Sequence, residues 1–261
     1  MCGFEGMYHK PQKSNKEINK YLKCASGSVV EYRLAKARVA GSNPVSRSFL
    51  FLPESLFYKG FRFFALEESC MLQNEWIQLV PPSLSLAEQA ADYYCRNREF
   101  LKAYGPKSEE VFFTPERQRE ILGNEIRSWR AKLSFHFYIR LAAEPEKIIG
   151  IVALNNVIYG AFCSAFLGYK LDQEYLNQGY MTMAVDMVTA YAFSVLGLHR
   201  LEANVMPRNK ASLRVLEKNG FLNEGLSKYY LNINGVWEDH IHMVKLNESM
   251  HRDKAGWAAS I

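Results

Sequence analysis

Apolar and polar residues change their spacing several times between Trp76 and Leu246, and each spacing predicts a type of secondary structure. Apolar residues three and four apart indicate helices, whereas alternation of apolar with polar residues indicates strands. Helices are predicted over residues 83–94, 97–104, 115–130, 179–196 and 209–218. Strands are predicted over residues 76–80, 134–141, 147–155, 163–171, 199–206, 222–232 and 236–246.

Local signals support two of these boundaries and help to define the fold class. Thr114, Pro115 and Glu116 combine a capping side chain, a proline at the first helical position and an acid in the first turn. Asn234 and Gly235 favour a tight turn between the last two strands, which then form an antiparallel hairpin. The order of elements predicts an α+β fold with a mixed, mostly antiparallel sheet, one parallel connection and flanking helices.

Residues 1–70 differ from the rest of the chain because they show no sustained periodicity. They hold 11 Lys/Arg and 6 Asp/Glu, whereas residues 71–261 hold 21 of each, so the net charge of +5 belongs to this segment. Residues 39–45, which read VAGSNPV, resemble the translation of a transfer-RNA gene. We expect residues 1–70 to be a disordered or non-native extension from a start codon assigned too far upstream. The alternative is a basic arm that binds nucleic acid or an anionic surface.

The remaining composition narrows the class of protein. The chain is 48% hydrophobic and 23% charged, which indicates a packed core, here expected over residues 71–248 with a disordered tail over 249–261. No apolar run approaches the roughly 18 residues of a membrane span, and no signal peptide is recognised, so we expect a cytoplasmic protein. The five cysteines form no Cys-x-x-Cys pair, and His240 and His242 lack an obvious third ligand, so no metal site is expected.

The most specific pattern begins at Gln178 and Gly179, which stand directly before the helical run over 179–196. A turn that leads into a helix exposes free backbone N–H groups beside the positive end of the helix dipole. Glycine lets a ligand approach that backbone closely. Such a turn can cradle a pyrophosphate, although a glycine in this place more often only allows the chain to turn.

The block over residues 176–221 resembles the acetyl-coenzyme A core of the GNAT N-acetyltransferases, and within them the RimJ/RimL-like branch, which acetylates ribosomal-protein alanines. Leu176 and Met181 depart from the usual residues, and the first departure affects a side-chain contact rather than the backbone cradle. The resemblance implies the GNAT fold, in which two parallel strands splay apart and the pantetheine arm of acetyl-CoA fills the gap. The matching residues are Gly179, Tyr180, Thr182, Ala184, His199, Arg200, Pro207, Asn209, Ser212, Gly220 and Phe221.

The resemblance also assigns residues to acetyl-CoA. The amides of residues 176–181 would hold the pyrophosphate, an amide within 166–168 would polarise the thioester carbonyl, and Asn209 would bond the pantetheine arm. Asn209 also suits a helix cap, and a solvated helix face explains Lys210, Arg214 and Lys218 better than phosphate binding does. The expected cofactor residues are Phe166, Leu167, Gly168, Leu176, Asn177, Gln178, Gly179, Tyr180, Met181, Thr182, Asn209 and Ser212.

Proton transfer has two candidates, each with a structural alternative. Glu202 is the candidate base, directly or through water, but an outward-facing strand residue explains it equally well. Ser212 resembles the hydroxyl that protonates the leaving thiolate in the RimL-like branch, and its alternative is a first-turn helix serine. Leu216 replaces the tyrosine acid of many GNAT enzymes, for which Tyr229 and Tyr230 are weak substitutes. Asp239-His240 matches the branch pattern, and there we expect a structural or substrate-edge role.

These observations favour an acetyl-CoA-dependent N-acetyltransferase that modifies the N-terminal alanine of a ribosomal protein. One alternative keeps the reaction and changes the acceptor to a polyamine, an amino-acid-like toxin or an aminoglycoside. A second alternative is a non-catalytic acyl-CoA-binding module on the same fold, because a fold does not determine its function. The expected partners are acetyl-CoA and an amine, with no membrane or direct nucleic-acid contact, in a monomer or homodimer.

Overall fold

The computed structural model describes residues 22–23, 29–30, 56–58, 61–66, 69–105 and 108–250, with side chains from residue 71 onward. The chain divides into two compact units, Met1–Leu50 and Phe51–Ile261. In the first unit, β1 (Leu22–Lys23) pairs antiparallel with β2 (Val29–Val30). The second unit contains all of the other elements and the site.

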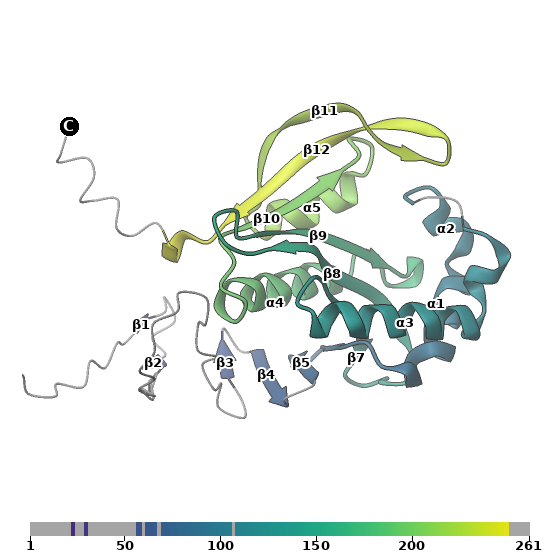
Figure 1. The fold of residues 1–261 in the computed structure, drawn as a ribbon, viewed down its shortest axis with the longest axis horizontal. Helices are drawn as coiled ribbons and strands as arrows, with labels where there is room; N and C mark the ends of the chain where they lie inside the picture. Colours follow the sequence, from purple (N-terminus) through teal and green to yellow (C-terminus); the bar gives the residue numbers. More distant parts are fainter. Residues whose placement is uncertain are drawn as a thin grey trace, which may run out of the picture. The chain divides into compact units, whose positions relative to one another are not determined.

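The second unit is built on a sheet of ten strands in the order β11-β12-β10-β9-β8-β7-β6-β5-β4-β3 (Figure 1). Every neighbouring pair is antiparallel except β9 and β10. The strands are β3 (Leu56–Tyr58), β4 (Phe61–Leu66), β5 (Ser69–Gln73), β6 (Ile77–Val80), β7 (Phe135–Leu141), β8 (Ile148–Ile158), β9 (Ser164–Leu171), β10 (Arg200–Val205), β11 (Leu222–Ile233) and β12 (Val236–Leu246).

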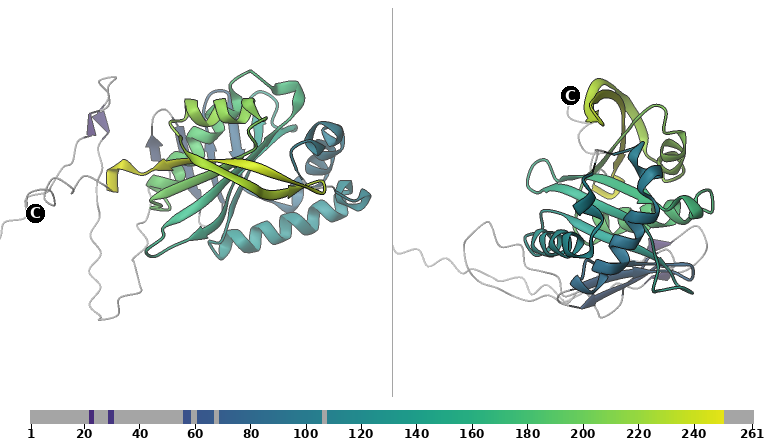
Figure 2. Two further views of the ribbon diagram at one scale, coloured as in Figure 1. Left: turned by 90° about the horizontal axis from the view of Figure 1, so that it is seen from above. Right: turned by 90° about the vertical axis from the view of Figure 1, so that its right-hand side faces the viewer.

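Helices cover both faces of this sheet, with α4 and α5 on one side and α1 to α3 on the other (Figure 2). Neighbouring residues of β7 show the division, because side chains alternate along a strand. Phe137 and Ile139 belong to the core cluster that contains α4, whereas Tyr138 packs with α1 and α3. The helices are η1 (Leu84–Leu86), α1 (Ala87–Arg96), α2 (Arg98–Lys102), η2 (Glu110–Phe113), α3 (Pro115–Arg130), η3 (Gln173–Tyr175), α4 (Tyr180–Ser194) and α5 (Lys210–Lys218).

The predicted α+β fold is confirmed, and most predicted elements agree with the structure to within a few residues. The Thr114 hydroxyl caps α3 by accepting a hydrogen bond from the N–H of Arg117 at 3.3 Å. Two differences concern boundaries: the helix predicted over 83–94 begins as a 3-10 turn, and the domain start expected at residue 71 falls inside β5.

Much of the predicted 1–70 extension, and residues 251–261 of the predicted tail, lie outside the described residues, so both assignments stay predictions. Within the described part of the chain, no helix is long and apolar enough to cross a membrane. The same residues contain no group of three or more His, Cys, Asp or Glu placed to hold a metal ion.

Candidate active site

The parallel strands β9 and β10 are paired over only part of their length. Arg200, Leu201 and Glu202 pair with residues 164–166, and the strands then separate as they approach α4 and α5. A cleft of about 750 Å³ lies at this separation. Its walls include Leu167 and Gly168 of β9 and Ala203 to Val205 of β10, so backbone groups of both strands face the cleft where a ladder would otherwise continue.

The loop between β9 and α4 forms one end of the cleft. Leu176 has φ −65°, Asn177 has φ +60° and Gly179 has φ +87°, so the sign of φ changes repeatedly along the loop. Alternation of this kind turns successive N–H groups toward one side and creates a concave anion site. Gly179 is also the N-cap of α4 and has no capping side chain, so the first-turn N–H groups of the helix point outward beside its positive dipole end.

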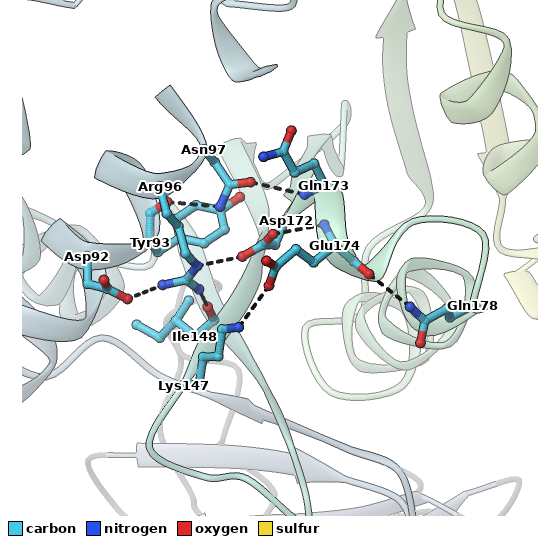
Figure 3. Close-up of polar contacts among 10 residues, drawn as sticks. All are labelled: Asp92, Tyr93, Arg96, Asn97, Lys147, Ile148, Asp172, Gln173, Glu174 and Gln178. Atoms are coloured by element: carbon cyan, nitrogen blue, oxygen red, sulfur yellow. Dashed lines mark hydrogen bonds and ion pairs between the residues drawn. The ribbon is translucent and has the colours of Figure 1, made fainter. Parts of the chain in front are cut away.

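A buried carboxylate fixes this loop to the first helix (Figure 3). Asp172, whose side chain is 1% exposed, accepts hydrogen bonds from Arg96 Nε at 2.6 Å and from the N–H of Glu174 at 3.0 Å. Arg96 is held in turn by Asp92 and by the carbonyl oxygen of Ile148. Burial alone would raise the pKa of Asp172, but hydrogen bonds from Asn97, Arg96 and the Glu174 N–H outweigh burial and lower it.

Further contacts hold both ends of the loop. Asn97 accepts from the N–H of Gln173 at 3.0 Å, and its own amide donates to the carbonyl of Tyr93 at 3.0 Å. Gln178 Nε2 donates to the carbonyl of Glu174 at 3.0 Å, and Lys147 lies 3.1 Å from the Glu174 carboxylate. Figure 3 shows that these contacts continue from α1 to the residue directly before Gly179. The cradle is therefore anchored by contacts within the chain itself.

The start of α5 forms the opposite wall of the cleft. Asn209 Oδ1 accepts from the N–H of Ser212 at 3.1 Å, so the alternative reading of Asn209 as a helix cap is correct, while Asn209 still lines the cleft. The Tyr169 hydroxyl lies 2.8 Å from Ser212 Oγ and 3.0 Å from the Ser212 carbonyl oxygen. Burial raises the pKa of Tyr169, and its hydrogen bond to Ser212 offsets this only in part, so the phenol remains protonated.

The other expected residues are divided between the cleft and the rest of the fold. Glu202 does not line the cleft, and its carboxylate accepts from Arg200 Nε at 2.8 Å, while Arg200 also binds Glu224. Leu216, at the position of the tyrosine acid in many GNAT enzymes, is fully buried. Cleft-lining members of the expected set are Leu167, Gly168, Leu176, Asn177, Gly179, Met181, Thr182, Asn209 and Ser212, whereas Phe166, Gln178 and Tyr180 are not among the lining residues.

Sequence reasoning missed several residues that build this site. Arg96 meets Asp172 across 76 positions of the chain, and no local pattern announces that pair. Tyr169 lies on a strand where an aromatic residue is expected only to pack. Asn204 also lines the cleft and was not expected to do so. His240, for which a structural or substrate-edge role was expected, lines it as well.

Known proteins show the same architecture. The family model described as acetyltransferase (GNAT) domain matches residues 77–222. The probable N-acetyltransferase YjcK of Bacillus subtilis is 40% identical over 177 residues, which is 68% of this chain and 97% of that protein.

Two solved structures extend the comparison. The ribosomal-protein-S5-alanine acetyltransferase of Vibrio fischeri is 36% identical with a TM-score of 0.64, covering 71% of this chain and 97% of the other. RimJ of Mycobacterium smegmatis, solved in complex with CoA-disulfide, is 28% identical with a TM-score of 0.63, covering 69% of this chain and 88% of the other. The family match, the splayed strands and the cradle agree: this chain belongs to the GNAT acetyltransferase family.

Proposed function

We propose that this enzyme transfers the acetyl group of acetyl-CoA to the α-amino group of a protein N-terminus, and that its acceptor is the N-terminal alanine of a ribosomal protein in the cytoplasm. The observation that carries the acetyl-CoA part is the cleft between β9 and β10, with an anchored anion cradle at one end. The similar Vibrio fischeri enzyme, named for ribosomal-protein-S5-alanine acetylation, supports the acceptor.

The residues of the cleft fit acetyl-CoA. When bound, acetyl-CoA supplies the thioester carbonyl that an amine attacks. The N–H groups around Asn177 and Gly179 would hold its pyrophosphate, since they form the concave anion site. The backbone of Leu167 and Gly168 would bond the pantetheine arm as a sheet bonds an added strand. A strand amide at the same place would polarise the thioester carbonyl.

Ser212 is the proposed acid for the leaving thiolate, and Tyr169 gives this role a structural basis. The Tyr169 phenol has one proton, which it donates either to Ser212 Oγ or to the Ser212 carbonyl. When Oγ accepts it, the serine proton is free to point into the cleft. The pair can thus pass a proton toward the sulfur, and Tyr169 acts through Ser212 as a positioning residue.

A thiol-release assay tests the proposed acceptor. Acetyl-CoA is offered with a peptide that begins with alanine, with the same peptide blocked by N-acetylation, and with spermidine and an aminoglycoside. We expect thiol release with the free alanine peptide and none with the blocked one, because only the former has an α-amino group. A higher kcat/KM for spermidine or the aminoglycoside would overturn the acceptor, and cofactor binding with no turnover of any amine would favour the non-catalytic module.

A further inference from the structure

His240 of β12 lines the cleft and is only 3% exposed. Its Nδ1 lies 3.0 Å from the carbonyl oxygen of Glu238. A carbonyl oxygen can only accept a hydrogen bond, so this contact assigns the proton to Nδ1 and leaves the lone pair of the neutral ring on Nε2. Within the described part of the chain, Nε2 has no hydrogen-bond partner. The cleft therefore contains an imidazole whose basic nitrogen is unused.

A second unused acceptor belongs to Asn204 of β10. Its Oδ1 is buried without a hydrogen-bond partner among the described residues, while its Nδ2 donates to the Tyr230 hydroxyl at 3.2 Å. The Tyr230 ring is centred 5.6 Å from the His240 ring. Asn204, Tyr230 and His240, which we call the amine cluster, thus form one continuous group beside the cleft. Two acceptors that lack donors suit a ligand that carries several N–H groups, such as an ammonium.

The amine cluster and the cradle lie on opposite faces of the sheet. Leu201, Ala203 and Val205 belong to the core that contains α4, and side chains alternate along a strand, so Asn204 faces away from α4. The cradle belongs to the N-terminus of α4. A thioester arm that enters from the cradle and passes between β9 and β10 would reach the amine cluster on the opposite face, where an acceptor can meet it.

We propose that the amine cluster is the acceptor site, with His240 Nε2 as the general base and Asn204 Oδ1 as the group that holds the amine. His240 takes one proton from the bound ammonium and later releases it to solvent. The neutral nitrogen attacks the thioester carbon, the C–N bond forms, and the C–S bond breaks. The second nitrogen proton passes to solvent as the amide forms. The thiolate receives the Ser212 proton, which solvent replaces, so that one proton is released in each turnover. This assignment gives Glu202 no part in the reaction.

Several charged and titratable groups surround His240. On its own strand lie Glu238, which is bound by Arg208; Asp239, which accepts from the N–H of Tyr229; and His242. On β11 lies Tyr230, and the His242 Nε2 is engaged by the Ser227 hydroxyl at 2.7 Å. The charged residues that line the rest of the cleft are Arg98, Glu99, Lys102, Lys170, Arg214 and Lys218.

The test compares His240→Asn with His242→Asn. Asparagine can still donate to the Glu238 carbonyl but has no basic nitrogen, whereas His242 lies on the same strand and does not line the cleft. We expect His240→Asn to lower kcat/KM for an alanine peptide by about 100-fold or more at pH 6.5. The deficit should shrink to about tenfold or less at pH 9.5, because an α-amino group with a pKa of about 7.7–8.0 is then already neutral. The affinity for acetyl-CoA and the melting temperature of His240→Asn should stay close to wild type. The His242 ring packs 4.9 Å from the Tyr230 ring but does not line the cleft, so any loss of activity in His242→Asn should be equal at pH 6.5 and pH 9.5.

Asn204→Leu, which is similar in volume, should raise KM for the amine more than it lowers kcat. The proposal is overturned if His240→Asn retains activity within threefold of wild type, or if its deficit is equal at every pH. The proposed alanine acceptor can be wrong while the amine cluster is right. If the wild-type enzyme acetylates spermidine but no peptide, the alanine acceptor is refuted, and the variants are then compared with spermidine as the substrate. Wild-type enzyme that acetylates no amine contradicts both proposals.

Discussion

Replacing Asp172 by asparagine tests whether the cradle depends on the buried network behind it. The substitution keeps the side-chain shape and an oxygen that can accept from the Glu174 N–H, but removes the charge that faces Arg96. Removal of one partner of a buried ion pair typically costs about 3–5 kcal/mol. Arg96 is 21% exposed and keeps Asp92 and the Ile148 carbonyl as partners, so the loss should be smaller, about 2–3 kcal/mol.

The pH dependence of this loss has a definite sign. The folded-state pKa of Asp172 is lowered, and a group of this kind contributes stability above its unfolded pKa of about 3.9. That contribution is lost as the pH falls through the folded-state pKa. The difference in unfolding free energy between wild type and Asp172→Asn should therefore be constant from pH 8 to about pH 5 and shrink below about pH 4.

Urea denaturation followed by circular dichroism measures the free energy of unfolding, and calorimetry measures the affinity for acetyl-CoA. That affinity should fall by about tenfold if roughly 1.4 kcal/mol of the anchoring energy holds the loop in its binding conformation. Asp92→Asn is the matched control, because Asp92 contacts the same arginine from a side chain that is 67% exposed. It should cost about 0.5 kcal/mol or less. Equal losses for the two variants, or unchanged cofactor affinity in Asp172→Asn, would refute the anchoring argument.

Three further predictions concern the cradle, the acid and the N-terminal segment. Gly179→Val should weaken acetyl-CoA binding strongly in calorimetry, whereas Gly197→Val, at a similar positive φ of +65° but outside the cleft lining, should cost stability alone. Ser212→Ala should lower turnover by about 100-fold with little change in cofactor affinity, and wild-type turnover at several pH values would end that assignment. Deleting residues 1–70 should leave a folded, cofactor-binding enzyme, because the pairs of β5 with β6 are made by Leu72 and Gln73; an unfolded product in circular dichroism would contradict this.

The sequence predicted those features that depend on neighbouring residues. Thr114 and Pro115 start α3, Asn234 and Gly235 close the final hairpin, and Gly179 precedes α4 with the positive φ that favours glycine. Each is a short-range effect of capping or turn chemistry, so a few adjacent residues suffice to read it. The limited pairing of β9 with β10 was expected from the family resemblance and not from the residues of either strand.

The features that escaped prediction are contacts between distant segments. Arg96 and Asp172 each look like ordinary surface charges, and only the fold buries one beside the other. Tyr169 becomes a partner of Ser212 because the fold brings the first turn of α5 next to β9. Periodicity and local motifs carry no information about such pairs, so the anchoring of the cradle could be seen only in the folded chain.

The choice of a general base shows the same limit at the level of chemistry. Glu202 and His240 are both polar residues on strands beside the cleft, and in sequence the carboxylate is the more obvious base. The fold reverses this order because Arg200 occupies the Glu202 carboxylate, whereas Glu238 engages only the Nδ1 of His240. A base must have a free lone pair within reach of the amine. Whether a side chain is available to accept a proton therefore depends on its neighbours in the sheet and not on its residue type alone. The same neighbours, on β10 to β12, would determine which acceptor the enzyme selects.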